Sequence, residues 1–382
     1  MAQAPENIKY WLALKFVEGL GNIGVRNLLR SFGTPERIFR TPLSLLCTVE
    51  GIGTKTAAGI KDFQDWQRID EEIDRMERCG AVAVTCQDPR FPKRLLHIYD
   101  CPFLLYVKGE LPAADMYIAM VGSRAASAYG RFTTERLSRE LTLQGAVVIS
   151  GMARGIDTAA HRGALSVKGK TVAVLGSGID VVYPPENEGL YHEIAGSGAV
   201  VTEYAMGTPP NAPHFPSRNR IISGMALGVV VVEATDKSGS LITARIALEQ
   251  GREVFAVPGG IDAAGSRGTN RLIKEGAKLV ENVHDILDEI RPQLSKTNAA
   301  TETSGKVTTA GMKRESSVTA SEKTMSASER ALLAALSRQP RHIDELIAAT
   351  GLNAPEVLAL LLQLELRGLI RRTAGNKYIL QE

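Results

Sequence analysis

The chain has 382 residues, of which 44% are hydrophobic and 23% are charged, and its formal net charge at pH 7 is +3. This length exceeds one domain of roughly 100 to 200 residues, so two or three folded units are expected. The hydrophobic share is ample for a packed core, the small net charge permits an anionic partner without demanding one, and no apolar stretch reaches the roughly 18 to 20 residues that a membrane-spanning helix needs.

Residues 1–78 are predicted to form an all-α domain. Helical periodicity opens at 11–16 and closes at 67–78, and no segment between them is convincing as a strand. The run Gly19-Leu20-Gly21-Asn22-Ile23-Gly24 matches the dinucleotide-binding pattern, but a helix precedes it where that fingerprint requires a strand. We therefore reject a dinucleotide site there.

A second glycine motif in this domain resembles a helix-hairpin-helix, as in SAM-like domains. Residues 50–60 place Gly51 and Gly53 in a hairpin before a helix, where free backbone N–H groups suit a phosphate. Residues 19–29 resemble a degenerate first copy of the same motif. Such pairs serve as nucleic-acid contacts or as scaffolds, and the sequence leaves both uses open.

Residues 79–290 alternate short apolar runs with helical segments, which is typical of a parallel sheet flanked by helices. Two extended runs, 81–85 and 103–107, are expected at the edge of the sheet. The main strands are predicted at 116–121, 146–149, 171–175, 199–202, 228–233 and 253–257. The fold class is therefore α/β: a Rossmann-like, doubly wound and mainly parallel sheet, with an all-α domain before it.

The composition changes again after residue 290. Residues 291–326 are rich in Thr, Ser, Ala, Lys and Gly and are predicted to be a flexible linker. Residues 327–382 show three short helical segments and a final hairpin, an order typical of a winged-helix domain. Its third helix carries little positive charge, which favours contact with a protein, while basic residues on the hairpin keep nonspecific DNA contact open.

Glycine-rich polar turns follow the predicted strands. In a doubly wound sheet the carboxyl ends of the strands lie along one edge, so the turns at 122–124, 150–157, 176–178, 214–220, 237–240 and 258–260 are expected to converge on one crevice. Helix N-termini and forked arginines there suit phosphate groups. The candidate nucleic-acid-binding residues are Gly122, Ser123, Arg124, Ser150, Gly151, Arg154, Gly155, Gly176, Phe215, Arg218, Asn219, Arg220, Ser238, Gly239 and Ser240.

The same turns lack the motifs of common catalytic and metal sites. The histidines and cysteines show no metal-ligand spacing, and neither a phosphate-binding P-loop nor a nucleophile elbow is present. We therefore expect no catalytic residue, no metal and no cofactor. No disulfide framework and no export signal are recognisable, so we expect a reduced, cytoplasmic protein.

A structural role explains four polar residues of the central block better than a catalytic role does. Asp157 and His161 lie four residues apart on one predicted helix, and a helix-capping aspartate with a packed histidine accounts for them better than an acid–base pair. Glu203 and Glu233 end predicted strands, and we expect them to bond neighbouring N–H groups or to orient arginines.

The turn motifs closely resemble those of one protein family. In chain order they are Gly122-Ser123-Arg124, then the run from Ser150 to His161, Tyr183-Pro184, the run from Phe215 to Gly224, the run from Ser238 to Ala244, and Val257-Pro258-Gly259. Together they resemble the DprA/Smf family across the whole central block. The flanking helical and winged-helix units resemble accessory domains that some members carry.

This resemblance implies a bacterial protein that binds single-stranded DNA without sequence specificity, protects it and helps to load the RecA recombinase during natural transformation. It implies binding without catalytic turnover, and a homodimer formed through the Rossmann-like domain. In such a crevice Arg124, Arg154, Arg218 and Arg220 would track the phosphates of the strand, and Phe215 would stack on a base.

Two departures from the family pattern lower the charge of the crevice. Pro185 follows Tyr183-Pro184 where some members have lysine, and Ala212 stands upstream of Phe215 where a lysine occurs in others. The contribution of each individual contact is therefore left open.

Two other classes of function stay open at this point. Nucleoside-monophosphate phosphoribohydrolases share similar turns, but they need Pro-Gly-Gly-x-Gly-Thr-x-x-Glu, whereas residues 258–263 read Pro-Gly-Gly-Ile-Asp-Ala. A small-nucleotide sensor with a winged-helix output accounts for the linker but leaves the helix-hairpin-helix unexplained.

Overall fold

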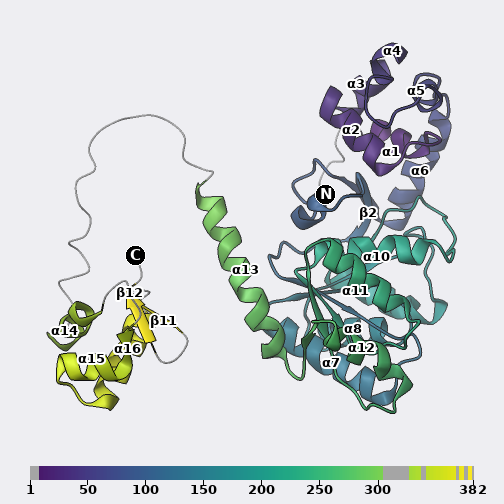
Figure 1. Ribbon diagram of the computed structural model, residues 1–382. Coiled ribbons are helices and arrows are strands. Elements are labelled where there is room, and N and C mark those ends of the chain that lie inside the picture. The colour runs from purple at the N-terminus through teal and green to yellow at the C-terminus, as the bar shows by residue number, and fades with distance from the viewer. Residues whose placement is uncertain (1–7, 304–326, 337–340, 367–369, 374–376, 381–382) are drawn as a thin grey trace, which may run out of the picture. The chain divides into compact units, whose positions relative to one another are not determined.

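The structure is a computed structural model that describes residues 8–303, 327–336, 341–366, 370–373 and 377–380 (Figure 1). The chain divides into two compact units, Met1–Gly305 and Lys306–Glu382. No helix among the described residues is both long and apolar enough to cross a lipid bilayer.

The larger unit begins with a helical region. Its helices are α1 (Ile8–Phe16), α2 (Asn22–Phe32), α3 (Pro35–Arg40), α4 (Leu43–Leu46), α5 (Thr54–Lys61) and α6 (Trp66–Cys79). Helix α1 precedes the first glycine motif, which confirms that no strand leads into it. The two hairpins lie side by side, because Asn27 Nδ2 on α2 donates to the carbonyl oxygen of Glu50 before α5 at 3.1 Å.

A nine-stranded sheet follows the helical region, in the order β1-β2-β6-β5-β4-β3-β7-β8-β9. Strands β1 and β2 pair antiparallel at one edge, β2 also pairs antiparallel with β6, and the strands from β6 through to β9 are parallel. The strands are β1 (Ala81–Thr85), β2 (Leu104–Gly109), β3 (Tyr117–Val121), β4 (Val147–Ser150), β5 (Thr171–Val174), β6 (Ala199–Thr202), β7 (Gly228–Val231), β8 (Glu253–Ala256) and β9 (Lys278–Leu279).

These strands confirm the predicted Rossmann-like sheet, including the two extended runs at its edge. The central strands β3 to β7 are buried along their whole length, because helices cover both faces and every position can be apolar. Strand β9 was not predicted. It has two residues, Lys278 and Leu279, which are both exposed and too few to show a periodic pattern.

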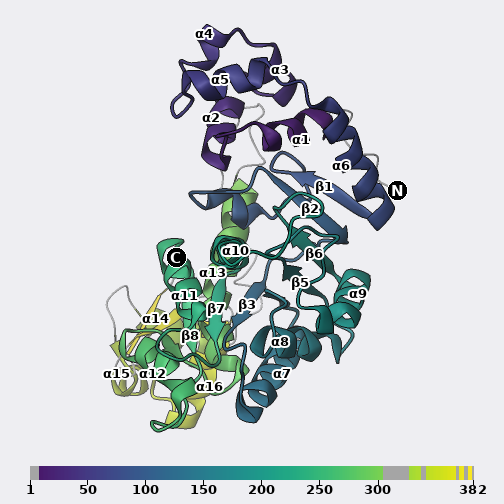
Figure 2. The ribbon, with the colours of Figure 1, turned by 90° about the vertical axis from the view of Figure 1, so that its right-hand side faces the viewer.

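Helices cover the two faces of the sheet (Figure 2). On one face lie α7 (Ala128–Leu143), α8 (Ile156–Leu165), α9 (Glu188–Ser197) and α13 (Val283–Thr303), and on the other lie α10 (His214–Met225), α11 (Gly239–Glu249) and α12 (Arg267–Lys274). The helical region shares one core with the sheet, in which Leu12 and Ile69 join Tyr106 and Val200. The predicted domains 1–78 and 79–290 therefore lie within a single compact unit.

Helix α13 corrects the predicted start of the linker. Instead of ending at residue 290, the helix continues to Thr303. Its first turns are anchored on the sheet by buried Ile286, Leu287 and Ile290. Once a helix is nucleated, the alanines, lysine and glutamate beyond residue 294 extend it at little cost, although the same composition resembles a linker. The rest of the predicted linker, 304–326, lies outside the described residues.

The smaller unit has the winged-helix order that was predicted. Its elements are α14 (Ala327–Ala335), β10 (Arg341–His342), α15 (Ile343–Thr350), α16 (Ala354–Leu366), β11 (Ile370–Thr373) and β12 (Lys377–Leu380). The strands form a sheet in the order β10-β12-β11, and Leu332, Leu346 and Leu361 form a small core with Ile370. The predicted hairpin turn, 374–376, lies outside the described residues.

Substitution of Gly155 should be far costlier than substitution of Gly145, although both have a positive φ, of 76° and 83°. A Cβ on Gly155 would lie 2.3 Å from the carbonyl oxygen of Ser123, whereas a Cβ on Gly145 would meet no atom within 4 Å. We expect Gly145→Ala to lower the free energy of unfolding by about 1 kcal/mol. Gly155→Ala should lower it by roughly 2 to 4 kcal/mol, since a backbone clash is added. Denaturant unfolding followed by tryptophan fluorescence measures both; equal losses would contradict the described packing.

The pH dependence of stability should depend on His161. This side chain of α8 is fully buried, its Nδ1 lies 2.8 Å from Thr171 Oγ1, and burial lowers its pKa to about 3, with the nearby charge of Arg218 adding to the effect. In the unfolded chain this imidazole has a pKa near 6.5, so it binds a proton at a pH where the folded chain keeps it neutral. The free energy of unfolding therefore falls as the pH drops from about 6.5 toward 3.

We expect this histidine to contribute up to about 1.4 kcal/mol per pH unit to that slope. Denaturant unfolding between pH 7 and pH 5 should show a shallower slope for His161→Gln than for the wild type. His192→Gln, at an exposed position of α9, is the control and should keep the wild-type slope. A wild-type slope in His161→Gln would show that this histidine is not held neutral.

Candidate nucleic-acid interface

The order of the strands reverses between β3 and β7, which creates a switch point at the carboxyl edge of the sheet. After β3 the chain proceeds outward through β4 and β5, and from β7 it proceeds in the other direction through β8. Crevices at such switch points are where doubly wound sheets bind ligands. A cleft with a cavity of about 660 Å³ opens here, and a smaller recess of about 60 Å³ shares Arg124, Ala153, Tyr183 and Phe215 with it. We refer to both together as the cleft.

The structure brings most of the predicted site residues together around this cleft. Those that line it are Gly122, Ser123, Arg124, Gly151, Arg154, Gly176, Phe215, Arg218, Asn219, Ser238, Gly239 and Ser240. Ser150, Gly155 and Arg220 are not lining residues, and neither is the turn at 258–260. The turns after β3, β4, β5, β6 and β7 therefore converge as expected, whereas the turn after β8 does not reach the cleft.

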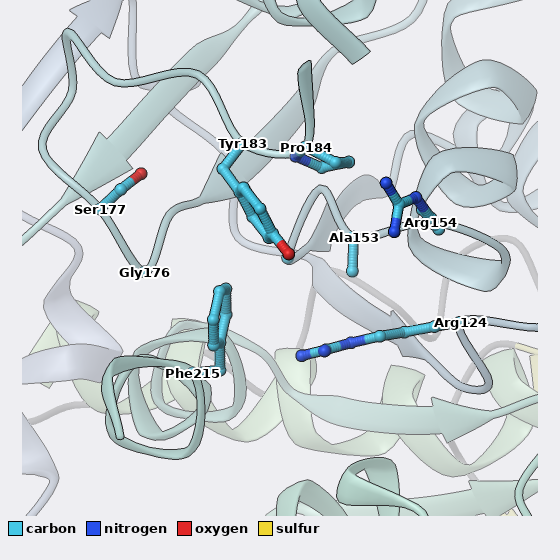
Figure 3. Close-up of a pocket in the computed structure, with 9 residues that line it drawn as sticks. Arg124, Ala153, Arg154, Gly176, Ser177, Tyr183, Pro184 and Phe215 are labelled. Carbon is cyan, nitrogen blue, oxygen red and sulfur yellow. The ribbon is translucent and has the colours of Figure 1, made fainter. Parts of the chain in front are cut away.

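Two exposed arginines project at the mouth of the cleft (Figure 3). The guanidinium of Arg124 lies 5.0 Å from the centre of the Phe215 ring and leaves its N–H edge free for an acceptor. Arg154 forms an ion pair with Glu186, and both side chains are about half exposed. Arg124 makes no ion pair within the described part of the chain, so it is the more available of the two for a phosphate.

An aromatic pair forms one wall of the cleft. Tyr183 and Phe215 have ring centres 5.6 Å apart at an interplanar angle of 45°, and Figure 3 shows the Tyr183 ring above the Phe215 ring. Tyr183 was not among the predicted site residues, nor were Ala153, Ser177 and Pro184, which also line the recess. An aromatic residue in the turn region after a central strand, as in Tyr183-Pro184, was the signal that could have identified it.

Arg218 is buried, with 4% of the residue exposed, and it joins the ends of two strands. Its Nη1 donates to the carbonyl oxygen of Gly151 at 2.5 Å and to that of Val174, and its Nη2 lies 3.8 Å from Asp157 Oδ2. Burial lowers the pKa of Arg218 to about 10, while the Asp157 carboxylate opposes this shift. A Cβ on Gly151 would lie 2.0 Å from Arg218 Nη2, so a side chain at this position would displace the guanidinium.

Arg220, which was predicted to contact phosphate, does not line the cleft. Its Nη2 pairs with Glu203, its Nε lies 3.2 Å from Asp100 Oδ2, and 12% of its side chain is exposed. Residues two apart on a helix point in nearly opposite directions, so when Arg218 faces the strand ends Arg220 faces away from the cleft. Arg220 therefore joins α10 to neighbouring segments.

Three other predicted residues stabilise the turns around the cleft through contacts within the protein. The Ser150 hydroxyl donates to the carbonyl oxygen of Met120 at 2.6 Å, which ties β4 to β3. Gly155, with its positive φ, lets the β4 turn pass close to the carbonyl oxygen of Ser123. Ser238 caps the N-terminus of α11, accepting from the Ser240 N–H at 3.4 Å.

His161 is packed in the core, and Glu233 and Glu203 make the kinds of contact that were predicted. Glu233 accepts from the Ser127 N–H at 2.9 Å at the start of α7, and Glu203 orients Arg220. Asp157 is not the predicted helix cap, because the N-cap of α8 is Gly155 and no side chain caps that helix. Asp157 accepts from the Ala153 N–H at 3.2 Å; burial raises its pKa, and Arg218 counteracts that shift. Among the residues described, no group of three or more His, Cys, Asp or Glu side chains could hold a metal ion.

Comparisons with known proteins agree on one family. The family model described as DNA recombination-mediator protein A matches residues 82–291, and the model of the DprA winged helix domain matches residues 316–376. Protein Smf of Synechocystis is 32% identical over 97% of this chain and 98% of its own length.

Two solved structures extend this similarity. The X-ray structure of DprA from Streptococcus pneumoniae has 37% sequence identity and a TM-score of 0.65, covering 74% of this chain and 98% of that one. A structure of DNA processing protein A from Helicobacter pylori, determined for its single-stranded DNA binding mode, has 30% identity and a TM-score of 0.51, covering 56% of this chain and 96% of that one. From the matched family models, the full-length relative and the shared fold, the chain belongs to the DprA/Smf family of DNA recombination-mediator proteins.

Proposed function

We propose that this protein binds single-stranded DNA in the cleft without sequence specificity and protects it. The observation that carries the proposal is the placement of exposed Arg124 against the ring of Phe215, beside the N-terminus of α11. Arginine and helix N–H groups bind phosphates, and an aromatic face stacks on any base, so this combination recognises a single strand without reading its sequence.

The proposal extends to the biological role and the assembly. The protein promotes the loading of RecA onto the bound strand during natural transformation. It works in the cytoplasm as a homodimer formed through its Rossmann-like domain, and it binds DNA without catalytic turnover. Membership of the family supports these statements, and the relative from Helicobacter pylori with its single-stranded DNA binding mode supports the choice of ligand.

Arg124→Ala should weaken binding of single-stranded DNA by about tenfold, because a charge-assisted hydrogen bond to phosphate is lost. The dissociation constant of a labelled mixed-sequence oligonucleotide, measured over a salt series, should show a log–log slope reduced by about 0.7 for this one contact. Arg139→Ala, at an exposed position of α7 that does not line the cleft, is the matched control.

The same titration with duplex DNA tests the preference for single strands. We expect weaker binding of the duplex, because its bases are stacked and unavailable to the Phe215 ring. Equal affinity for single and double strands, or equal losses in the Arg124→Ala and Arg139→Ala proteins, would refute the cleft as the DNA site. Saturable binding of a mononucleotide at micromolar concentration would then favour a nucleotide sensor.

Phe215→Ala should weaken single-strand binding by roughly 1 to 3 kcal/mol while the salt slope stays unchanged, since a stacked base is lost and no phosphate contact is removed. Phe215→Tyr keeps the aromatic face and should retain most of the affinity. The same salt series measures both variants. A change of slope in Phe215→Ala, or an equal loss in Phe215→Tyr, would show that the ring does not act by stacking.

A further inference from the structure

Two loops carry the aromatic wall of the cleft, and both meet helix α6 of the helical region. The β5 loop, residues 175–184, follows β5 and carries Tyr183. The β6 loop, residues 203–213, follows β6 and leads directly to Phe215 on α10. Neither loop has regular backbone pairing along its length, so other contacts must hold the two rings in place.

The first contact is made by Glu72 of α6, of which 5% is exposed. Its Oε1 accepts hydrogen bonds from the Tyr106 hydroxyl at 2.6 Å and from the Met206 N–H at 2.9 Å. Tyr106 belongs to β2 and Met206 to the β6 loop, so one buried carboxylate ties the loop to both the sheet and the helical region. Without this acceptor the buried Met206 N–H would have no hydrogen-bond partner, which would strongly destabilise the loop conformation.

The second contact is made by Arg75, one turn further along the same face of α6. Its Nη2 lies 2.8 Å from Asp180 Oδ2 in the β5 loop, and Asp180 Oδ1 accepts from the Gly207 N–H of the β6 loop at 2.6 Å. A Cβ on Gly207 would lie 2.4 Å from Arg75 Nη2, so this glycine, with its positive φ, admits the guanidinium. Arg75 therefore braces both loops through one aspartate.

Further contacts connect the braced loops to the Phe215 ring. The Gly178 N–H donates to the carbonyl oxygen of Thr208 at 2.9 Å, which joins the two loops. The Tyr204 ring stacks on the His214 ring at 4.2 Å, and His214 Nδ1 lies 3.2 Å from the carbonyl oxygen of Gly176. Phe215 is the next residue, so its position depends on a continuous series of contacts that begins at α6.

We infer that Glu72 and Arg75 are positioning residues of the DNA site, and that the helical region serves the cleft by holding its aromatic wall in the binding geometry. This inference rests on the proposed function. Rings that are already ordered lose less conformational freedom when a base stacks on them, so a braced wall binds more tightly than a loose one without an additional DNA contact.

The test uses full-length protein and two variants with matched controls on α6. Glu72→Leu removes the buried acceptor, and Glu77→Leu changes an exposed glutamate of the same helix. Burial lowers the pKa of half-buried Lys15, and the carboxylates of Glu203 and Glu72 oppose that shift, so Glu72→Leu carries a cost in folding. Arg75→Ala is therefore the principal variant, because 43% of the Arg75 side chain is exposed, and Arg78→Ala is its control.

Two measurements are compared for each protein. Amide hydrogen exchange measures how often the loops open. We expect faster exchange in 176–183 and 203–215 for Glu72→Leu and Arg75→Ala, but not for the two control variants. Their affinity for a labelled single-stranded oligonucleotide should fall by about 3- to 10-fold with an unchanged salt slope, because no phosphate contact is lost. In a Phe215→Ala background the same substitutions should have little further effect, since their influence passes through that ring.

Each other outcome overturns a stated part of the inference. Unchanged exchange in both loops would show that α6 does not brace them. Faster exchange with unchanged affinity would show that the bracing does not serve DNA binding. If the losses of affinity add fully to that of Phe215→Ala, the two α6 residues do not act through the Phe215 ring. If Glu77→Leu and Arg78→Ala lose as much affinity, the effect is not specific to Glu72 and Arg75. Failure of the wild-type protein to bind single-stranded DNA would instead refute the proposed function, and the exchange data would still decide whether the loops are braced.

Discussion

The buried guanidinium of Arg218 is the interaction on which the cleft depends. A cation with so little exposure is stable only if its donors are satisfied, and here the carbonyl oxygens of Gly151 and Val174 and the carboxylate of Asp157 surround it. These groups lie at the carboxyl ends of β4 and β5 and at the start of α8. Because Arg218 belongs to α10, the same contacts hold the first turn of that helix, and with it Phe215, against the ends of the strands.

Several neighbouring residues become necessary once Arg218 occupies this position. Gly151 must lack a side chain because the guanidinium fills the space of a Cβ, and Gly176 faces the ring of Phe215 at 3.0 Å from its own ideal Cβ position. At these two glycines the backbone itself therefore borders the cleft. Charge is placed at the mouth, on Arg124 and Arg154, where solvent still surrounds the guanidinium groups and an extended anion can reach them.

The helical region carries a sequence motif for nucleic-acid binding, but its contacts with the cleft come from a different part of the region, helix α6. Its paired hairpins match a motif that binds nucleic acid in some proteins, yet its clearest physical connection to the cleft runs through Glu72 and Arg75 on α6. The shared core explains this connection. Because α1 and α6 pack on the same apolar cluster as β2 and β6, the helical region cannot move without disturbing the strand end that leads to the β6 loop.

Local patterns in the sequence were enough to establish the sheet, the winged-helix order and the convergence of five turns. A run such as 199–202 is buried at every position because both faces of the strand are covered, and the glycine and prolines at 207–210 mark the turn that follows it. Strand β9 and the continuation of α13 escaped prediction for the opposite reason. A two-residue strand has no period, and a linker-like composition still propagates a helix that its neighbours have nucleated.

Which polar side chains face the cleft was decided only by the tertiary structure. Arg218, Arg220 and Arg124 are the same residue type in similar glycine- and serine-rich segments, but one is buried among carbonyl groups, one is paired with Glu203 and Asp100, and one is exposed beside an aromatic ring. Sequence determines that an arginine is present and on which element it lies. Its partners come from strands and loops that are distant along the chain, so only the packing of those elements determines whether its charge supports the fold or remains available to a ligand.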